Sequence, residues 1–310
     1  MKLGIFVDGP ERRLFVEAGD VAIDLLVADT RDDFASMTAF IEGGDAALHA
    51  AEEIAQNPSD AACRPLSDLR LSPPLLPSTV LCAGSNYRAH NAEKAGSPLS
   101  GREPEFFLKT SDCVIGSGDN IVCDDRLTRK LDCETELAIV IGRAGRHIPV
   151  EDALAHVFGY TVANDVTSRD RQVRRTEDGT VFYELGRGKA FDTSLPLGPV
   201  ITTASEIPEP QALQLSTTIN GERRQSANTA DMIWTCAELI HFFSVNFTLK
   251  PGMVILTGTP AGTAWSVDAE LGGTWQPTEG LVAATRYCLP GDEVISEIDG
   301  IGALRNPIVG

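Results

Sequence analysis

The feature that most constrains the fold of this chain is the segment Leu131–Arg143, LDCETELAIVIGR. Three carboxylates, Asp132, Glu134 and Glu136, stand at every second position within an otherwise apolar run. Because side chains on a β-strand alternate between its two faces, a strand here would point all three carboxylates the same way. The segment therefore predicts a strand with one acidic face. The opposite face would be filled by Thr135, Leu137, Ile139 and Ile141.

Two interpretations of these carboxylates are open from the strand alone. Three acids on one buried face repel one another and are costly to remove from water unless a cation lies among them. Oxygen ligands of this kind suit a hard divalent ion such as Mg²⁺ or Mn²⁺. The alternative is a half-exposed edge strand whose acidic face is solvated. Asp165, just after the apolar segment Phe158–Ala163, could complete a metal site with Glu134 and Glu136, or could cap a turn.

The charge and composition of the chain argue against several classes of protein. A net charge of −18 at pH 7 repels phosphate backbones, so no nucleic acid partner is expected. The sequence has no run of about 20 apolar residues, so no membrane span is expected. The N-terminal residues do not have the pattern of a signal peptide. Seven cysteines, an odd number without a CxxC pair, fit reduced thiols in a cytoplasmic protein.

The pattern of the sequence changes near residue 73. The first part mixes short strands, such as Leu3–Asp8, with an alanine-rich helical pattern through Ala46–Gln56. The proline-rich stretch Arg64–Pro77 follows and indicates a boundary near residues 68–78. We therefore predict a small N-terminal α/β domain over residues 1–73 and a larger, mostly β domain over residues 74–310.

Beyond this boundary, strands and turns dominate the pattern. Strands without regular alternation with helices favour a largely antiparallel, sandwich- or roll-like core over a doubly wound sheet. Asn220-Gly221 predicts a two-residue hairpin turn. The clearest helix is predicted over Asp231–Val245, with Thr229 or Asp231 as its cap. The predicted strands are Val80–Ala83, Glu105–Leu108, Glu136–Ile141, Phe158–Ala163, Leu213–Ile219, Met253–Thr257 and Glu293–Ile298.

A histidine and two lysines stand in segments that suit catalysis. His90 and Glu93 are three residues apart, so on one helical turn the carboxylate could orient the imidazole as a base toward water. A surface contact is the alternative for this pair. Lys189 and Lys109 could each bind an oxyanion near a metal, or could be ordinary exposed lysines. The glycines and the proline in residues 96–101 predict a mobile loop, as a lid requires.

Three further polar side chains are candidates for substrate contacts. Arg169 and Gln172 are three residues apart and would share a helical face, where the guanidinium could hold a substrate carboxylate. Thr259, in the segment GTPAG after a predicted strand, could bind a carboxylate with its hydroxyl and the neighbouring N–H groups. Neither a phosphate-binding loop nor a GxSxG elbow occurs, so nucleotide binding and Ser-His-Asp hydrolysis are not expected.

Taken together, these segments resemble the fumarylacetoacetate hydrolase family. The resemblance implies an α+β, mostly β fold of the mixed β-sandwich roll type, usually assembled as a homodimer. Residues 1–73 are similar to the small variable domain that many bacterial members carry. The matching segments keep the family's order and cover roughly residues 78–310: GSNYRAHNAE, PEFFLK, DCETELAIVIGR, GYTVANDVTSRDRQ, GKAFDTSLPLGP, INGERRQSANTADMIW, LKPGMVILTGTPAG and PGDEVISEIDGIGALRNPI.

The resemblance also implies a role for each candidate residue. The ligands of Mg²⁺ or Mn²⁺ would be Glu134, Glu136 and Asp165, whereas Asp132 would lie outside that set. The catalytic residues would be His90, Glu93 and Lys189. The residues that contact the oxo-acid end of the substrate or support the site would be Lys109, Arg169, Gln172 and Thr259.

The implied substrate is a 2-oxo acid, often a 2,4-dioxo acid, and the implied reaction is hydrolysis of its C–C bond with release of pyruvate or a related oxo acid. The same site would support oxaloacetate decarboxylation, keto–enol isomerisation or hydration of 2-hydroxydienoates in aromatic catabolism. A non-catalytic binding protein with a structural metal is a further alternative. Residues 173–188 and 263–290 are longer than in common members, so they would either reshape the pocket or lie on the surface or in the dimer interface.

Overall fold

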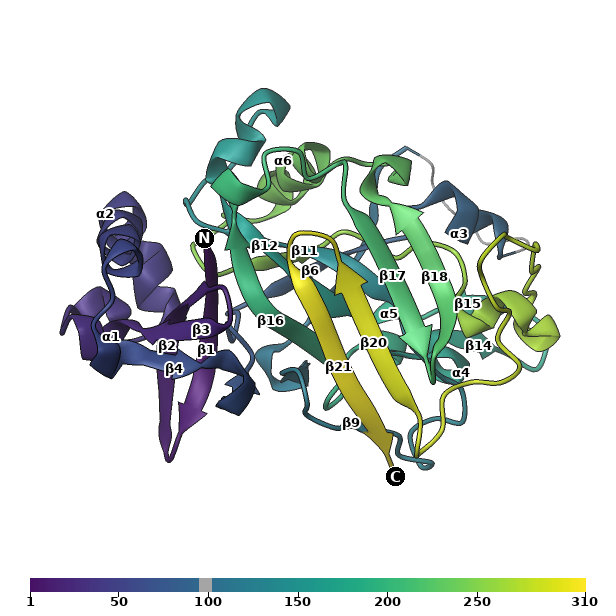
Figure 1. Ribbon diagram of the computed structural model, residues 1–310. Helices are drawn as coiled ribbons and strands as arrows, with labels where there is room; N and C mark the ends of the chain where they lie inside the picture. The colour runs from purple at the N-terminus through teal and green to yellow at the C-terminus, as the bar shows by residue number, and fades with distance from the viewer. Residues whose placement is uncertain (95–101) are drawn as a thin grey trace.

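The computed structural model describes residues 1–94 and 102–310 (Figure 1). The mobile loop predicted over residues 96–101 lies outside these described residues. Strands predominate over helices, and the prediction of a mostly β, α+β fold is confirmed. Among the helices of the described residues, none combines the length and the apolar character that crossing a membrane requires.

The larger sheet of the described residues has 12 strands. They are β1 (Lys2–Asp8), β2 (Glu11–Ala18), β3 (Val21–Asp24), β4 (Cys63–Pro65), β5 (Leu71–Ser72), β6 (Val80–Gly84), β7 (Glu105–Lys109), β8 (Val114–Ile115), β11 (Thr135–Ile141), β12 (Val157–Asn164), β16 (Leu195–Thr203) and β19 (Val254–Leu256). In space the main path runs β4-β3-β2-β1-β16-β12-β11-β19-β6-β7. Most neighbours are antiparallel, as predicted, whereas β6 with β19 and β8 with β16 are parallel pairs.

The second sheet lies across the middle of the first and closes a sandwich (Figure 1). Its strands are β9 (Ile121–Val122), β17 (Gln214–Ile219), β18 (Glu222–Asn228), β20 (Glu293–Ile298) and β21 (Gly302–Val309). Leu137 and Ile139 of β11 share one apolar core with Leu215 of β17 and Ile298 of β20. Two short pairs complete the β structure: β10 (Leu131–Asp132) with β13 (Thr167–Ser168), and β14 (Val173–Arg175) with β15 (Val181–Tyr183).

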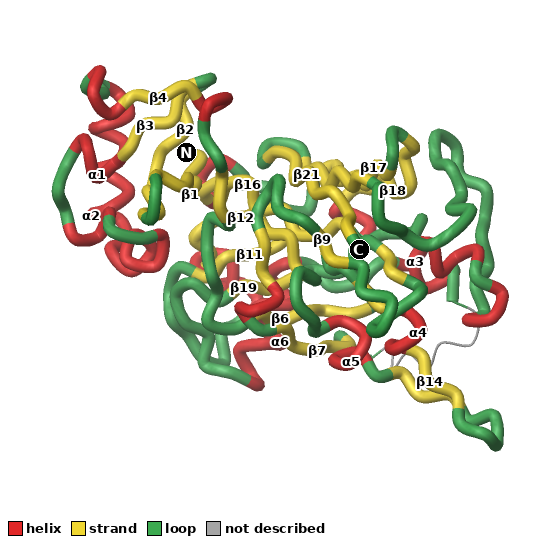
Figure 2. The backbone as a smooth tube through the Cα atoms, turned by 90° about the horizontal axis from the view of Figure 1, so that it is seen from below, coloured by secondary structure: helices red, strands yellow, loops and turns green. Residues whose placement is uncertain are grey.

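Helices lie toward the two ends of the molecule and, in one case, near its middle (Figure 1). They are α1 (Leu25–Ala28), α2 (Met37–Gln56), α3 (Arg88–Ala92), α4 (Arg169–Gln172), α5 (Leu185–Lys189) and α6 (Cys236–Asn246). Figures 1 and 2 place α1 and α2 with the N-terminal strands, and α3, α4 and α5 toward the opposite end of the molecule. These three short helices carry four of the candidate site residues: His90, Arg169, Gln172 and Lys189.

The strand predictions are confirmed to within one residue at each end. The predicted hairpin is also confirmed, because β17 and β18 pair across Asn220-Gly221. Both turn residues have a positive φ, 51° and 80°, which Asn and Gly tolerate better than other residues.

The helix predicted over Asp231–Val245 is wrong at its start, because α6 begins five residues later. The Asn86 side chain accepts a hydrogen bond from the Trp234 N–H at 2.7 Å, which ties the preceding chain to the loop after β6. The helix therefore starts after this contact, with Thr235 as its N-cap instead of the two earlier residues predicted. Thr235 and Glu238 form a reciprocal capping box.

Residues 1–73 share both a sheet and a core with the rest of the chain. Strand β1 pairs with β16, with Lys2 opposite Thr202. The Phe40 ring of α2 meets the Phe158 ring of β12 edge to face, with centroids 6.1 Å apart. Figure 1 shows β1–β4 with α1 and α2 as a group at one side of the sandwich. The domain division at residue 73 stays a prediction.

Candidate active site

The acidic segment runs from β10 into β11 with one interruption. Asp132 ends β10, Glu134 lies between the two strands, and Glu136 is the second residue of β11. All three side chains are buried. Strand β11 is paired on both sides, with β12 and β19, so the interpretation as a solvated edge strand is wrong. On the other side of β11, the core contains Leu137, Ile139 and Ile141.

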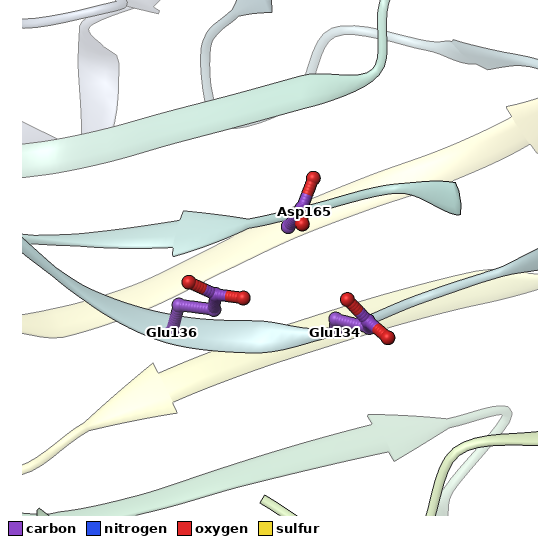
Figure 3. A group of neighbouring side chains, drawn as sticks. All are labelled: Glu134, Glu136 and Asp165. Carbon is purple, nitrogen blue, oxygen red and sulfur yellow. The ribbon is translucent and has the colours of Figure 1, made fainter. Parts of the chain in front are cut away.

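Asp165 reaches this acidic segment because β12 pairs antiparallel with β11. Asn164, the last residue of β12, lies opposite Thr135, and the Asp165 N–H donates to the main-chain carbonyl of Glu134 at 2.8 Å. One carboxylate oxygen from each of Glu134, Glu136 and Asp165 lies within 4.8 Å of the other two (Figure 3). We call these three residues the acidic triad. Buried carboxylates at this spacing suit a divalent cation.

Two buried lysines balance part of the charge of the acidic triad. Lys189, the last residue of α5, donates hydrogen bonds to the carboxylates of Glu134 and Asp165. Although burial opposes its charge, these carboxylates raise the pKa of Lys189 above its usual value. The Lys109 ammonium lies 2.8 Å from Asp165 Oδ1 and donates to the main-chain carbonyl of Ser194 at 2.8 Å. Both lysines therefore hold Asp165 in place.

Glu136 is the member of the acidic triad with unmatched charge. The Gly258 N–H donates to its carboxylate at 2.7 Å. Within the described part of the chain, no Lys or Arg nitrogen lies within 4.0 Å of it. Burial, and then the charge of Asp165, raise the pKa of Glu136 well above its usual value. At Glu134 burial acts in the same direction, but Arg169 and Lys189 hold the pKa well below normal. A divalent cation would balance the negative charge of Glu136, so these residues fit such an ion.

Arg169, at the start of α4, is fixed by three side chains. Its Nε donates to Asp132 Oδ2 at 2.9 Å, one terminal nitrogen donates to Gln172 Oε1 at 3.0 Å, and the other donates to Glu134. Its guanidinium also lies over the Trp265 ring, 5.2 Å from the centroid. Asp132 is not one of the three clustered carboxylates. It supports the guanidinium that neutralises Glu134.

The predicted pair of His90 and Glu93 lies beside the acidic triad. His90 Nδ1 is 3.2 Å from Glu93 Oε2, and the Gly262 N–H donates to Glu93 Oε1 at 2.7 Å. His90 Nε2 lies 4.0 Å from Glu134 Oε1, so the imidazole stands between the two carboxylates. Both side chains of the pair are buried, which excludes a surface contact. Burial lowers the pKa of His90 and raises that of Glu93 to about 8.

Thr259 connects β11 to β18. Its hydroxyl donates to the main-chain carbonyl of Thr135 at 3.1 Å and accepts from Gln225 Nε2 at 2.9 Å. Thr259 therefore holds the start of β11 against β18 while lining the same cavity as the triad.

The sequence prediction did not single out Lys94 and Trp265, although both lie at the site. Lys94 follows Glu93 directly and lines the same cavity as His90 and the acidic triad. Its position directly after the matching segment GSNYRAHNAE is the signal that could have identified it. Trp265 comes from residues 263–290, and Tyr183 from residues 173–188 stacks on it with centroids 6.1 Å apart. The two long segments therefore meet beside the site, where Trp265 touches Arg169.

The cavity between these side chains encloses only about 30 Å³. This space accommodates about one water molecule. The side chains that fill the site must therefore move apart to admit a small organic acid.

A β-sandwich roll that buries three clustered carboxylates beside a His–Glu pair defines the class of the protein as an enzyme with a site for a divalent metal. The chain belongs to the fumarylacetoacetate hydrolase family. The family description "Fumarylacetoacetate (FAA) hydrolase C-terminal" matches residues 79–309. The family resemblance and the expectation of an enzyme are thereby confirmed.

Proteins of the same family are similar to this chain over most of its length. Oxaloacetate tautomerase YisK of Bacillus subtilis is 38% identical over 274 residues, which cover 86% of this chain and 84% of that protein. The fumarylacetoacetate hydrolase of Exiguobacterium antarcticum is 32% identical, with a TM-score of 0.76 over 100% of this chain and 99% of that one. Maleylpyruvate hydrolase of Sphingobium sp. SYK-6, solved with manganese(II) and pyruvate, is 28% identical, with a TM-score of 0.74 and the same coverage.

Proposed function

We propose that this chain is a divalent-metal-dependent enzyme that interconverts the keto and enol forms of a 2-oxo acid of the oxaloacetate type. The observation that carries the proposal is the position of His90 Nε2, 4.0 Å from the Glu134 carboxylate. Enolisation needs a base for the proton on C3 and positive charge for the oxygen on C2. The His90 imidazole can act as the base, and the Lys189 ammonium, which donates to the same Glu134 carboxylate, brings positive charge close to it. The name of the Bacillus relative, an oxaloacetate tautomerase, supports the same reaction.

In this proposal, Glu134, Glu136 and Asp165 would hold Mg²⁺ or Mn²⁺, which would supply Lewis-acid chemistry at the 2-oxo group. The active form of the His–Glu pair is the one in which Glu93 is ionised and accepts the Nδ1–H. His90 Nε2 then takes the proton as the C3–H bond breaks.

Lys189 completes the proton balance of the proposed reaction. Its ammonium gives a proton to the C2 oxygen, where negative charge develops, and an enol O–H bond forms. Arg169 supports the site by pairing with Asp132 and Glu134, and Gln172 accepts a hydrogen bond from its guanidinium. Lys109 and Thr259 support the site, since their polar atoms bond to neighbouring protein groups.

Hydrolysis of a C–C bond in an acylpyruvate is a second candidate function. The observation that favours it is the buried contact between His90 and Glu93, which suits a base that activates water. The maleylpyruvate hydrolase neighbour supports this possibility. In this reaction the water oxygen bonds to the C4 carbonyl carbon, the bond between C3 and C4 breaks, and pyruvate leaves as its enolate, which Lys189 stabilises.

An assay of purified protein with Mg²⁺ or Mn²⁺ tests both candidates. Oxaloacetate is followed by its enol absorbance, and acylpyruvates, fumarylpyruvate and 2-hydroxydienoates are followed by loss of substrate. We expect tautomerisation of oxaloacetate to be the fastest reaction. Faster release of pyruvate from acylpyruvates would favour the hydrolase, and no turnover despite metal binding would favour a non-catalytic protein.

The substitution Glu136→Gln tests the metal site itself. It keeps the shape of the side chain but removes its charge, so metal affinity and turnover should each fall by at least ~100-fold. Metal affinity is measured by calorimetry and turnover by the assays above. Glu297→Gln, on the exposed side of β20, is the matched control. Full activity of the wild-type protein in EDTA would contradict the proposal.

We also propose that the protein acts as a cytoplasmic homodimer. All seven cysteines are free thiols, which supports a reducing compartment. Light scattering of the purified protein in solution tests the dimer, and a mass of one chain would contradict it.

A further inference from the structure

Lys94 is a cation of the active-site cavity that the proposed reaction does not use. Lys94 directly follows Glu93 in the sequence, and its side chain lines the same cavity as the acidic triad. The main chain is anchored on both sides: the Lys94 N–H donates to the Asn91 carbonyl at 3.2 Å, and Lys94 bridges to Gly273. The position of the side chain is therefore set by α3 and by the long segment 263–290.

The contacts of the Lys94 ammonium are weak ones. Its Nζ lies 3.5 Å from Ser85 Oγ and 5.5 Å from the centroid of the Trp265 ring. Within residues 1–94 and 102–310, no carboxylate oxygen lies within 4.0 Å of it. Burial lowers the pKa of Lys94 to about 7. An ammonium group held away from water without an anionic partner is costly, so this arrangement suits an anion that arrives with a ligand.

The other cations of the described cavity already have carboxylate partners. Lys189 pairs with Glu134 and Asp165, and Arg169 pairs with Asp132 and Glu134. A 2-oxo acid bound at the acidic triad would place its oxo group and adjacent carboxylate there. A second carboxylate, farther along the substrate, could pair with Lys94, which has no carboxylate partner among the described residues of the cavity.

We propose that Lys94 binds the second carboxylate of the substrate and thereby selects 2-oxo dicarboxylic acids over 2-oxo monocarboxylic acids. The inference rests on the proposed function, because it assumes that the oxo-acid end lies at the acidic triad. The Trp265 ring and the Ser85 hydroxyl both lie close to the Lys94 ammonium. Lys94 is thus a specificity-determining residue that leaves the proton transfers to His90 and Lys189.

The first test compares Lys94→Met and Lys94→Arg with the wild-type enzyme on paired substrates. Oxaloacetate and fumarylpyruvate carry two carboxylates, whereas phenylpyruvate and acetylpyruvate carry one. For the dicarboxylic acids, Lys94→Met should raise KM by about 10- to 100-fold with little change in kcat, because a charge-assisted hydrogen bond is lost. For the monocarboxylic acids KM should stay within about twofold of wild type, and Lys94→Arg should recover most of the loss. Lys250→Met, at an exposed lysine, is the control.

Equal loss with both kinds of substrate would overturn the inference, because it would indicate a structural role. No loss with either kind would overturn it as well. A fall in kcat without a change in KM would assign Lys94 to the chemistry instead of to substrate recognition, and would also contradict the inference.

A binding measurement separates this inference from the proposed reaction. Calorimetry with Mn²⁺-loaded protein compares pyruvate with 2-oxoglutarate and 2-oxoadipate, none of which needs to be turned over. The wild type should bind a dicarboxylic acid more tightly than pyruvate, and Lys94→Met should remove that preference while its Mn²⁺ affinity is unchanged. A preference that persists in Lys94→Met would overturn the inference. Turnover that fails while this preference holds would reject the proposed reaction and keep the role of Lys94.

Discussion

Single side chains in this site depend on one another through charge. Asp132 supports Arg169, Arg169 neutralises Glu134, and Lys189 connects Glu134 to Asp165. Removing one partner of a buried ion pair leaves an uncompensated charge, which typically costs about 3–5 kcal/mol of stability. Substitutions at these residues will therefore change folding and activity together, and a binding readout is needed to separate the two.

The ionisation of Glu93 predicts a pH dependence of stability in the metal-free protein. Its pKa is about 8 in the folded protein, against an ordinary value of 4.5. The folded state therefore holds the proton more tightly than the unfolded state. The contribution of Glu93 protonation to the free energy of unfolding is complete below about pH 4.5 and is lost as the pH rises through 8. Glu93→Gln mimics the protonated carboxyl. The free energy of unfolding of the variant minus that of wild type should rise by up to ~1.4 kcal/mol per pH unit between about pH 5 and pH 8.

Urea unfolding in EDTA at several pH values measures this difference. Glu297→Gln, at an exposed glutamate, should follow the wild-type curve across the whole range. If the curve of Glu93→Gln also ran parallel to that of wild type, the raised pKa of Glu93 would be refuted.

At the residue scale, the sequence predicts the buried carboxylates because their alternation is a local property of the chain, although the structure divides this segment between β10 and β11. The spacing of His90 and Glu93 is equally local, and the two side chains do meet. Trp265 could not be predicted in this way. Its contact with Arg169 depends on how the long segment after β19 returns to the site, and no local pattern encodes that return.

At the scale of elements, the N-terminus of α6 offers a direct test of the observed helix start. The Thr235 hydroxyl accepts from the Glu238 N–H, so Thr235→Ala should lower the free energy of unfolding by about 1 kcal/mol. Urea denaturation measures the loss, and Thr248→Ala, at an exposed threonine beyond the helix, serves as the control. If the helix instead started near Asp231, the substitution Thr235→Ala would fall inside a helix and would have little effect.

The hairpin and the helix start differ in what determines them. Asn220-Gly221 forms its turn from the backbone preferences of two adjacent residues, so the sequence predicts it. The start of α6 depends on Asn86, about 150 residues earlier, whose side chain bonds to the Trp234 N–H and to the Thr257 carbonyl. Periodicity over Asp231–Val245 is helical throughout, and tertiary contacts of the residues just before Thr235, this one among them, delay the start of the helix.

At the scale of the whole molecule, the cysteines report how completely the two sheets and the N-terminal residues enclose their cores. Six of the seven are buried, and Cys63 of β4 is partly exposed. A soluble thiol reagent such as Ellman's should therefore modify about one thiol quickly in the native protein and all seven after denaturation. Cys63→Ser should remove the fast reaction. Several fast thiols in that variant would mean that a core is open in solution.

The pairing of β1 with β16 has a consequence for how the chain behaves alone. In a shortened chain that lacked residues 1–73, β16 would carry unpaired N–H and C=O groups along part of its length, and the Phe158 ring would lose its cover. Bare strand margins of this kind recruit strands from other molecules and promote aggregation. In the whole chain, residues 1–73 cover this margin of β16 and the Phe158 ring.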